Sequence, residues 1–276
     1  MFSQRTRKRF GQHWLQSDDV LHAMLEAAAV NRRDCVLEIG PGTGALTRWL
    51  LPLVDAVMAV EIDRDLCRKL QNQFARHDNF RLVSGDILEL DLATVVSGED
   101  FPFALPNKVV ANIPYYITGP ILERLLGTIA TPNPHPYDTI VLLVQKEVAE
   151  RLYARPGSRA FGALSVRVQY LADCELVCPV PAKAFQPPPK VDSAVVKLTP
   201  RAPAIAAERP DKFEQLLKAG FGSKRKMLRN NLKEDIDRDA LTHIMAQLSI
   251  ALEARAEDLT VAQWVALSNT ILKQHP

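Results

Sequence analysis

Short apolar runs rich in β-branched residues alternate with amphipathic segments from about Asp34 onward. Such runs predict buried strands, and the segments between them have the spacing of helices with one buried face. This alternation predicts an α/β fold with a parallel, doubly wound sheet that binds its ligand at the carboxyl ends of the strands. The predicted strands are 35–39, 56–60, 80–83, 109–111 and 140–144, and the predicted helices are 45–53, 64–74 and a segment from about 146.

The later part of the chain follows a different pattern. Two predicted strands, 174–178 and 193–198, are separated by a proline-rich stretch and no helix, which predicts an antiparallel hairpin at one edge of the sheet. Residues 199–210 contain three prolines and are typical of a linker, and a helical pattern then continues to about residue 272. We therefore predict a domain of residues 1–200 and a small all-α domain of residues 201–276.

Composition narrows the class of protein. The chain has 276 residues, is 47% hydrophobic and carries a formal net charge of +2, which suits one large and one small domain. It has no apolar run of the roughly 20 residues that a membrane helix needs, and no secretory signal is expected at its basic N-terminus. The four scattered cysteines favour a reduced, cytoplasmic protein. Cys174 and Cys178 lack a second ligand pair, so ordinary strand residues are favoured over a zinc site and no metal is expected.

Positive charge is concentrated in two segments. A single charged run is usually a solvated surface, but two separated basic runs favour a nucleic-acid partner. The basic residues are Arg5, Arg7, Lys8 and Arg9 in an N-terminal arm, and Lys218, Lys224, Arg225, Lys226 and Arg229 in the helical tail.

A glycine-rich turn at 40–44 joins the first predicted strand to the first helix. Glycines there let the backbone approach a ligand, and the helix start offers unpaired N–H groups. The turn fits the G-x-G-x-x-A pattern of dinucleotide sites, the E-x-G-x-G-x-G pattern of S-adenosylmethionine sites that begins at Glu38, or a plain tight turn.

Acids at the next two strand ends complete a predicted adenosine pocket. Glu61 is placed to bind both hydroxyls of a ribose, and Asp86 to accept a hydrogen bond from an adenine amino group. Ile62 and Ile87 are placed to line the faces of that adenine. The predicted pocket comprises Gly40, Gly42, Glu61, Ile62, Asp86 and Ile87.

The run Asn112-Ile113-Pro114-Tyr115 follows the fourth predicted strand. The Asn112 amide and the carbonyl before the proline can accept hydrogen bonds from an amino group on a flat ring, and Tyr115 can stack on that ring. A hydride-transfer enzyme would account for the glycine turn and Glu61 but not for this run. We therefore predict a protein that acts on an amine-bearing base.

Together these motifs resemble the ribosomal RNA adenine N6-dimethyltransferases, and most closely the bacterial KsgA type. Three further stretches carry the resemblance, at residues 10–15 (FGQHWL), 185–196 (FQPPPKVDSAVV) and 221–232, so that it spans almost the whole chain. His13 and Trp14 stand where that family usually has Asn and Phe. Tyr116 and Gly222 are further departures.

The resemblance implies a Rossmann-like methyltransferase that uses S-adenosylmethionine to dimethylate two adjacent adenines in a loop near the 3′ end of 16S ribosomal RNA. Its partner would be the 30S subunit or a precursor, and the enzyme a monomer. The alternatives are a large-subunit RNA methylase, a DNA adenine methylase (which usually carries an acid in place of Asn112) and a nonenzymatic assembly factor. The implied catalytic residues are Asn112, Tyr115 and Phe185; Gln12, His13, Leu15 and Asn112 join the cofactor pocket; and Arg5, Arg7, Lys8, Arg9, Lys224, Arg225, Lys226 and Arg229 contact RNA.

Overall fold

The computed structural model describes residues 13–97, 104–234 and 236–274. The predicted arm residues Arg5, Arg7, Lys8 and Arg9, and the predicted cofactor residue Gln12, lie outside these ranges. The chain divides into two compact units. The first contains the residues up to 125, 135–149 and 175–200, and the second contains 126–134, 150–174 and the residues from 201 onward.

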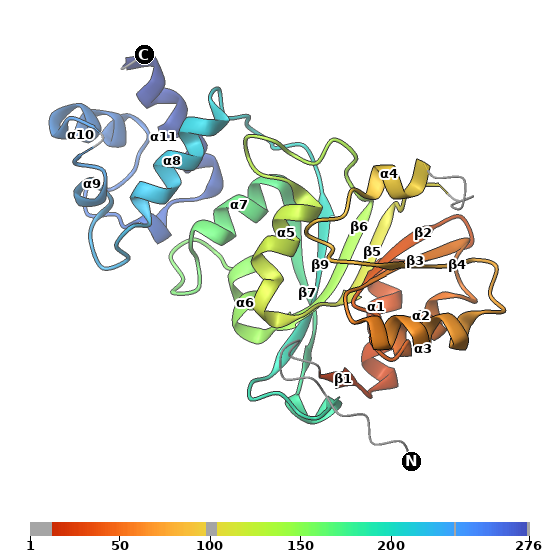
Figure 1. The fold of residues 1–276 in the computed structure, drawn as a ribbon. Coiled ribbons are helices and arrows are strands. Elements are labelled where there is room, and N and C mark those ends of the chain that lie inside the picture. Colours follow the sequence, from red (N-terminus) through yellow and green to blue (C-terminus); the bar gives the residue numbers. More distant parts are fainter. Residues whose placement is uncertain (1–12, 98–103, 235, 275–276) are drawn as a thin grey trace. The chain divides into compact units, whose positions relative to one another are not determined.

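A seven-stranded sheet organises the fold, in the order β4-β3-β2-β5-β6-β9-β7 (Figure 1). The strands from β4 to β6 run parallel, whereas β9 is antiparallel to β6 and lies between β6 and β7. A separate two-stranded ladder joins β1 to β8. The strands are β1 (Trp14–Leu15), β2 (Cys35–Ile39), β3 (Ala56–Glu61), β4 (Phe80–Ser84), β5 (Lys108–Asn112), β6 (Thr139–Gln145), β7 (Ala172–Val180), β8 (Phe185–Gln186) and β9 (Ser193–Pro200).

Helices follow most of the parallel strands. In the first unit, α1 contacts β5, β6 and β9, α2 contacts β3, and α3 contacts β3 and β4. In Figure 1 these three helices lie together beside the sheet, whereas α4 and α5 lie apart from them. The helices are α1 (Asp18–Ala28), α2 (Ala45–Leu50), α3 (Arg64–Phe74), α4 (Leu92–Ser97), α5 (Thr118–Leu126), α6 (Lys146–Leu152), α7 (Ala163–Leu171), α8 (Pro210–Gly220), α9 (Leu228–Asn231), α10 (Arg238–Gln247) and α11 (Val261–Gln274).

The sequence explains why these elements form. Every residue of β2 and β3 is buried, as expected for central strands covered on both faces. Ser17 caps α1 by accepting a hydrogen bond from the Val20 N–H, and Asp63 caps α3 in the same way from the Asp65 N–H. The predicted α/β fold, with its antiparallel strand near one edge and its helical C-terminal region, is confirmed. The helix predicted over 45–53 is shorter and ends at Leu50.

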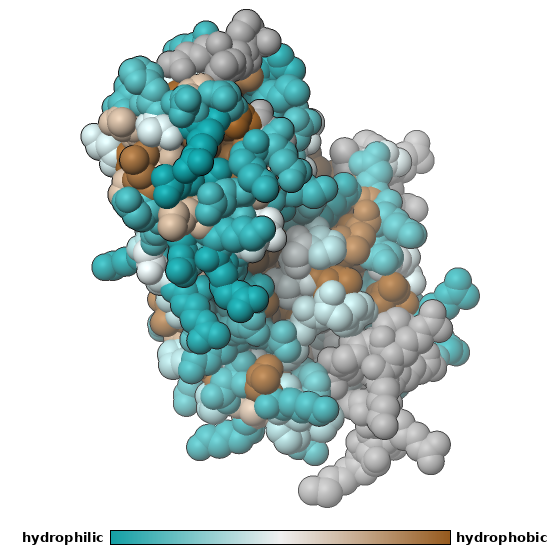
Figure 2. Space-filling model, turned by 90° about the vertical axis from the view of Figure 1, so that its left-hand side faces the viewer, coloured by the Kyte–Doolittle hydropathy of each residue, from teal (hydrophilic) through white to brown (hydrophobic). Residues whose placement is uncertain are grey.

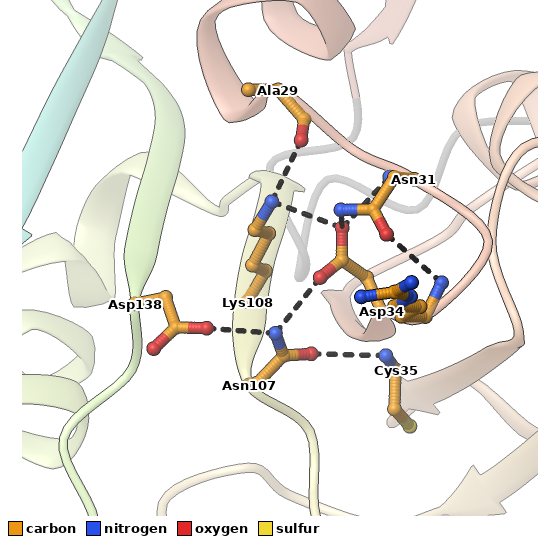
Figure 3. A network of polar contacts seen from close by, with 8 residues as sticks. Ala29, Asn31, Asp34, Cys35, Asn107, Lys108 and Asp138 are labelled. Carbon is orange, nitrogen blue, oxygen red and sulfur yellow. Dashed lines mark hydrogen bonds and ion pairs between the residues drawn. The ribbon is translucent and has the colours of Figure 1, made fainter.

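A buried polar network holds together the amino-terminal ends of β2 and β5, opposite the ligand edge of the sheet (Figure 3). The Lys108 ammonium donates to an Asp34 carboxylate oxygen at 2.9 Å and to the Ala29 carbonyl at 2.7 Å, so it also anchors the end of α1. Asn107 donates to Asp34 at 2.9 Å and to Asp138 at 2.8 Å, and it accepts a hydrogen bond from the Cys35 N–H. This network fixes where both strands begin.

The second unit contains a helical cluster with its own core. Trp264 is fully buried there, and its indole N–H donates to the Ala256 carbonyl at 3.2 Å. Gly220 ends α8 against this indole, and a β-carbon at Gly220 would lie only 2.4 Å from the Trp264 ring. The close packing of α8 and α11 therefore depends on this glycine.

The surface shown in Figure 2 is largely hydrophilic, with scattered hydrophobic patches. None of the helices within the described ranges has both the length and the apolar character needed to cross a bilayer.

Candidate active site

A cavity in the first unit lies where β2, β3, β4 and β5 end. The loops after these four parallel strands meet at one edge of the sheet, which is where open α/β folds bind ligands. All the predicted cofactor residues within the described ranges line this cavity, and so does Tyr115. They are His13, Leu15, Gly40, Gly42, Glu61, Ile62, Asp86, Ile87 and Asn112.

The glycine turn forms one wall of the cavity. Gly42 has a φ of +61°, and a β-carbon there would lie 2.4 Å from the Trp14 ring. Any larger residue would therefore displace the indole as well as strain the backbone. The Gly42 N–H donates to Glu61 at 3.2 Å, so the turn is also tied to the end of β3. The glycine turn is thus held by its contacts with the Trp14 ring and with Glu61, both of which line the cavity.

Two carboxyl groups are buried in this wall. Glu38, in β2, is only 2% exposed, and it accepts a hydrogen bond from the Thr47 hydroxyl at 2.6 Å. Glu61, at the end of β3, is 6% exposed, and it accepts N–H bonds from Gly42 and from Asp63, the latter at 2.9 Å. Burial raises the pKa of Glu38 to about 8, and it also raises the pKa of Glu61.

Ile62, Asp86 and Ile87, which follow β3 and β4, also line the pocket. Asp86 is only partly buried, and one of its oxygens accepts the Leu88 N–H at 2.9 Å. Ile87 is buried, whereas Ile62 is 44% exposed, which is unusual for a large apolar side chain. An apolar group exposed at the edge of a pocket suits contact with a flat ligand such as a base.

Asn112 ends β5 and faces the N-terminal motif. Its amide nitrogen lies 3.5 Å from the His13 carbonyl oxygen, and within the described ranges its side-chain oxygen receives no hydrogen bond. A β-carbon at Gly40 would lie 3.9 Å from the Asn112 carbonyl, so the glycine turn and this motif are neighbours. This orientation leaves an acceptor oxygen available for a ligand amino group.

Tyr115 is held by two contacts. Its hydroxyl forms a 2.6 Å hydrogen bond with the Ser193 hydroxyl, which is fully buried at the start of β9. The His13 ring lies roughly parallel to the Tyr115 ring, with centroids 6.2 Å apart, and His13 Nδ1 lies 2.8 Å from the Pro187 carbonyl oxygen. Burial raises the pKa of Tyr115, which the bond to Ser193 opposes, so the phenol stays protonated and its ring is fixed in orientation.

The placement of Phe185 differs from the prediction that it covers the second face of a base. Its side chain is 2% exposed and belongs to the core of the first unit, together with Leu15 and Val180, and it does not line the cavity. The physical reason is the ladder between β1 and β8, which pairs Leu15 with Phe185 and turns the ring into the core. Here Phe185 is a core anchor.

The basic tail residues lie in and after the turn that follows α8. Lys224, Arg225 and Lys226 are exposed, as phosphate contacts require. Arg229 differs, because it is half-buried in α9 and its Nε is buried without a hydrogen-bond partner. Of the predicted cluster, Lys218, Lys224, Arg225 and Lys226 are therefore exposed, and Arg229 is half-buried.

Three residues of the site had no assigned role from the sequence. Glu38 was visible only as the first letter of a glycine motif, and Trp14 only as a departure from the family pattern. Trp14 lines the cavity, and its indole nitrogen is buried with no hydrogen-bond partner among the residues that the structure describes. Ser193 gave no signal of its own, because a serine at a strand start is unremarkable until its partner is known.

Comparison with known proteins decides the family. A family model described as "Ribosomal RNA adenine dimethylase" matches residues 3–273. The chain belongs to this family. A protein of Trichormus variabilis named "Ribosomal RNA small subunit methyltransferase A" is 62% identical over 268 residues, which cover 97% of this chain and 98% of that protein. A protein of the same name from Nostoc punctiforme is 62% identical over 274 residues, covering 97% of this chain and 95% of that protein.

Solved structures agree with this assignment. A dimethyladenosine transferase from Plasmodium falciparum superposes with a TM-score of 0.78 and 27% identity, covering 95% of this chain and 98% of that one. The 23S rRNA methyltransferase ErmE superposes with a TM-score of 0.72 and 26% identity, covering 92% of this chain and 98% of that one.

Family membership makes this chain an S-adenosylmethionine-dependent ribosomal RNA adenine dimethyltransferase. The observed pocket suits that cofactor. It offers three acids, Glu38, Glu61 and Asp86, and no Lys or Arg of the described residues lines it, which suits a cationic ligand with ribose and amino groups to bind. The predicted family, enzyme class and cofactor are confirmed.

Proposed function

We propose that this enzyme dimethylates the N6 amines of two adjacent adenines in a loop near the 3′ end of 16S ribosomal RNA. The 62% identity to proteins named as small-subunit methyltransferases supports this choice over a large-subunit RNA, since the 23S methyltransferase is only 26% identical. The partner we propose is the 30S subunit or its precursor, in the cytoplasm, with the enzyme acting as a monomer. The role is in biogenesis of the small subunit.

In this proposal the cofactor's adenosine lies toward Glu61 and Asp86. The Glu61 carboxylate accepts hydrogen bonds from the ribose hydroxyls, and Asp86 accepts one from the adenine amino group. Ile62 and Ile87 cover the adenine faces. His13 and Leu15 close the pocket from the N-terminal motif, and Gly40 and Gly42 let the backbone approach. Gln12 belongs to the same motif by family resemblance.

The observation that carries the catalytic proposal is the available side-chain oxygen of Asn112 at the edge of this pocket. Adenine N6 is a poor nucleophile because its lone pair is delocalised into the ring. Hydrogen bonds accepted by Asn112 and the Ile113 carbonyl favour a more pyramidal, more nucleophilic nitrogen, and they stabilise positive charge as it develops there. The cofactor supplies a methyl group activated by a sulfonium. The methylated nitrogen is acidic, so it loses its proton without a strong base.

Positioning supplies the remainder of the rate enhancement. A base in structured RNA must be unstacked to reach the pocket, at a cost of a few kcal/mol, and stacking on an aromatic ring returns about 1–3 kcal/mol. Tyr115 is the proposed platform, because Ser193 holds its ring in place. A stacking role for Phe185 would require this side chain to leave the core, so we assign one aromatic face only.

The proposed RNA contacts are electrostatic. Lys224, Arg225 and Lys226 are exposed and suit phosphate contacts, which position an RNA without reading its sequence. Arg229 would contribute only at its guanidinium edge, because its Nε is buried. The arm residues Arg5, Arg7, Lys8 and Arg9 remain a prediction from the sequence. The basic residues at 224–229 would give the predicted domain 201–276 its docking role.

The deciding experiment is methyl transfer from radiolabelled S-adenosylmethionine to purified 30S subunits that lack the modification, followed by mapping of the methylated bases. Incorporation of four methyl groups per particle at two neighbouring adenines is the expected result. Transfer to 50S subunits alone would select the large-subunit alternative. Transfer to neither particle would favour a nonenzymatic assembly factor.

Asn112→Ala tests the catalytic assignment within the same assay. Loss of the Asn112 side-chain acceptor in the transition state should reduce turnover by about 100-fold or more. Binding of S-adenosylmethionine, measured by calorimetry, should change by less than about threefold. Asn112→Asp, which keeps an acceptor oxygen, should retain more turnover than the alanine variant. Full turnover in the alanine variant would refute the role.

A further inference from the structure

Tyr116 is an exposed aromatic residue at the opening of the catalytic cavity. It lines that cavity together with Tyr115, and yet it is 59% exposed. Among the residues that the structure describes, no other Phe, Trp or Tyr is exposed to this degree. A side chain that both lines a cavity and faces solvent lies at the rim of that cavity. Core packing therefore does not account for this ring.

The backbone that carries this ring is fixed by hydrogen bonds. Residues Tyr115–Ile117 form a single 3-10 turn between β5 and α5. The Ile117 N–H donates to the Pro114 carbonyl at 3.3 Å, and the hydroxyl of the buried Thr118 donates to the Tyr115 carbonyl at 3.1 Å. A tyrosine on a fixed turn offers a large contact surface at a low cost in conformational entropy.

The two tyrosines of this turn face different ways. A 3-10 helix has three residues per turn, so consecutive side chains point about 120° apart. Tyr115 is half-buried, with its hydroxyl bonded to Ser193 at the start of β9, whereas Tyr116 is exposed. The two rings are thus placed to meet two different groups, one inside the cavity and one at its rim.

We propose that Tyr116 stacks on the nucleotide next to the target adenine, outside the cavity, while that adenine stacks on Tyr115 inside it. An unstacked base stays joined to its neighbours by the sugar-phosphate backbone, so a neighbouring nucleotide lies at the opening through which the base entered. Aromatic side chains that hold successive bases in this way are common in single-strand binding sites. The inference rests on the proposed function and extends it to a second nucleotide of the same substrate.

This arrangement treats two adjacent adenines unequally. The RNA strand enters the site in one direction, so a ring on one side of the opening meets either the 5′ or the 3′ neighbour of the target, and not both. Each adenine of the pair is a neighbour of the other. The second adenine therefore lies against Tyr116 in only one of the two cases, and in the other case the ring meets the nucleotide beyond the pair.

Methyl transfer to 30S subunits that lack the modification provides the first test. Tyr116→Ala should lower kcat/KM by about fivefold or more, which is the lower end of what stacking of one base contributes. Tyr116→Phe retains the ring, so its kcat/KM should stay about fivefold or more above that of the alanine variant. The matched control is Leu105→Ala, which removes a 43% exposed apolar side chain before β5, at the opposite edge of the sheet. That control should change kcat/KM by less than about twofold.

Substituted subunits test whether the contact is with the neighbouring base. In one preparation uracil replaces the 5′ adenine of the pair, in another it replaces the 3′ adenine, and transfer to the remaining adenine is measured. Uracil offers a smaller ring for stacking. The loss caused by Tyr116→Ala should therefore shrink by about twofold or more in one preparation and stay unchanged in the other. Where a substituted subunit is not a substrate of the wild type, the comparison on unsubstituted subunits decides alone.

The outcomes separate this inference from the proposed function. Unchanged kcat/KM in Tyr116→Ala, an equal loss in Tyr116→Phe, or the same loss on all three kinds of subunit overturns the stacking role while leaving methyl transfer in place. A matching loss of S-adenosylmethionine affinity in calorimetry would assign the ring to the cofactor and overturns the role as well. If thermal unfolding shows that the alanine variant does not fold, Tyr116→Leu, which keeps apolar volume without a flat ring, takes its place. No transfer to 30S subunits by the wild type overturns the proposed function and this inference together.

Discussion

Replacing Lys108 with methionine should destabilise the first unit by about 3–5 kcal/mol, because it removes one partner from a buried ion pair. The Lys108 ammonium lies 2.9 Å from an Asp34 carboxylate oxygen, and the two residues are only 8% and 4% exposed. Methionine fills a similar volume but leaves the carboxylate without its cation. It also leaves the Ala29 carbonyl at the end of α1 without its 2.7 Å donor (Figure 3).

Urea unfolding at pH 7, followed by tryptophan fluorescence, measures this loss, since Trp14 and Trp49 lie in the first unit. With a denaturant slope of about 3 kcal/mol per M, the midpoint should fall by roughly 1–2 M. The matched control is Lys197→Met. Lys197 also pairs with a carboxylate, Glu175 at 3.1 Å, but on a solvent-accessible part of the sheet. That variant should lose no more than about 1 kcal/mol.

The pH dependence tests the cause. Burial alone would raise the pKa of Asp34, but hydrogen bonds from Asn107, Lys108 and Asn31 outweigh it and lower that pKa. A carboxyl whose pKa is lowered by folding stabilises the protein above its unfolded value of about 3.9, and this contribution is lost as the pH falls through the folded pKa. Without Lys108, burial prevails and the pKa of Asp34 rises, so protonation relieves the variant at acid pH. The gap between wild type and Lys108→Met should therefore shrink from pH 7 to pH 4.5. A loss equal to that of Lys197→Met, or a gap that widens on acidification, would refute the reasoning.

Three further substitutions, the last with a matched control, have definite expected outcomes. Trp14→Phe removes a buried N–H that has no partner among the described residues, so thermal unfolding of the ligand-free protein should show no loss of stability. Tyr115→Phe leaves the buried Ser193 hydroxyl unpaired and should cost about 1–2 kcal/mol in urea unfolding. Gly220→Ala forces a β-carbon into the Trp264 ring and should cost about 1–3 kcal/mol, whereas Gly119→Ala, with nothing within 4 Å, should be neutral or stabilising in the same measurement.

The sequence predicted the parallel strands and the cavity for a common reason. Strands covered on both faces appear as unbroken apolar runs, and the loops after parallel strands must meet at one edge, so polar residues at successive strand ends converge. Glu61, Asp86 and Asn112 were assigned to one pocket on this basis, and all three line it. The order of the strands was not needed for that step.

Pairings between distant segments could not be predicted in the same way. Phe185 appeared available for stacking, because its proline-rich surroundings are typical of an exposed loop. Its burial results from a two-residue ladder with β1, which joins segments 170 positions apart and has no periodic signal. The pairing of Lys108 with Asp34, 74 positions apart, is hidden for the same reason. In both cases the partner, and not the local sequence, decides the environment.

Two buried acids, Asp34 just before β2 and Glu38 within it, show how the partners of a side chain decide its environment. Asp34 lies at the amino-terminal end of the strand, where Lys108, Asn107 and Asn31 satisfy its charge. Removing one of these partners is therefore costly for stability, and the contacts contribute nothing to ligand binding. Glu38 lies four residues further on, near the carboxyl-terminal end, where Thr47 supports it with its hydroxyl and its backbone N–H and no Lys or Arg of the described residues lines the cavity. A fold that served only stability would have paired or replaced that second acid.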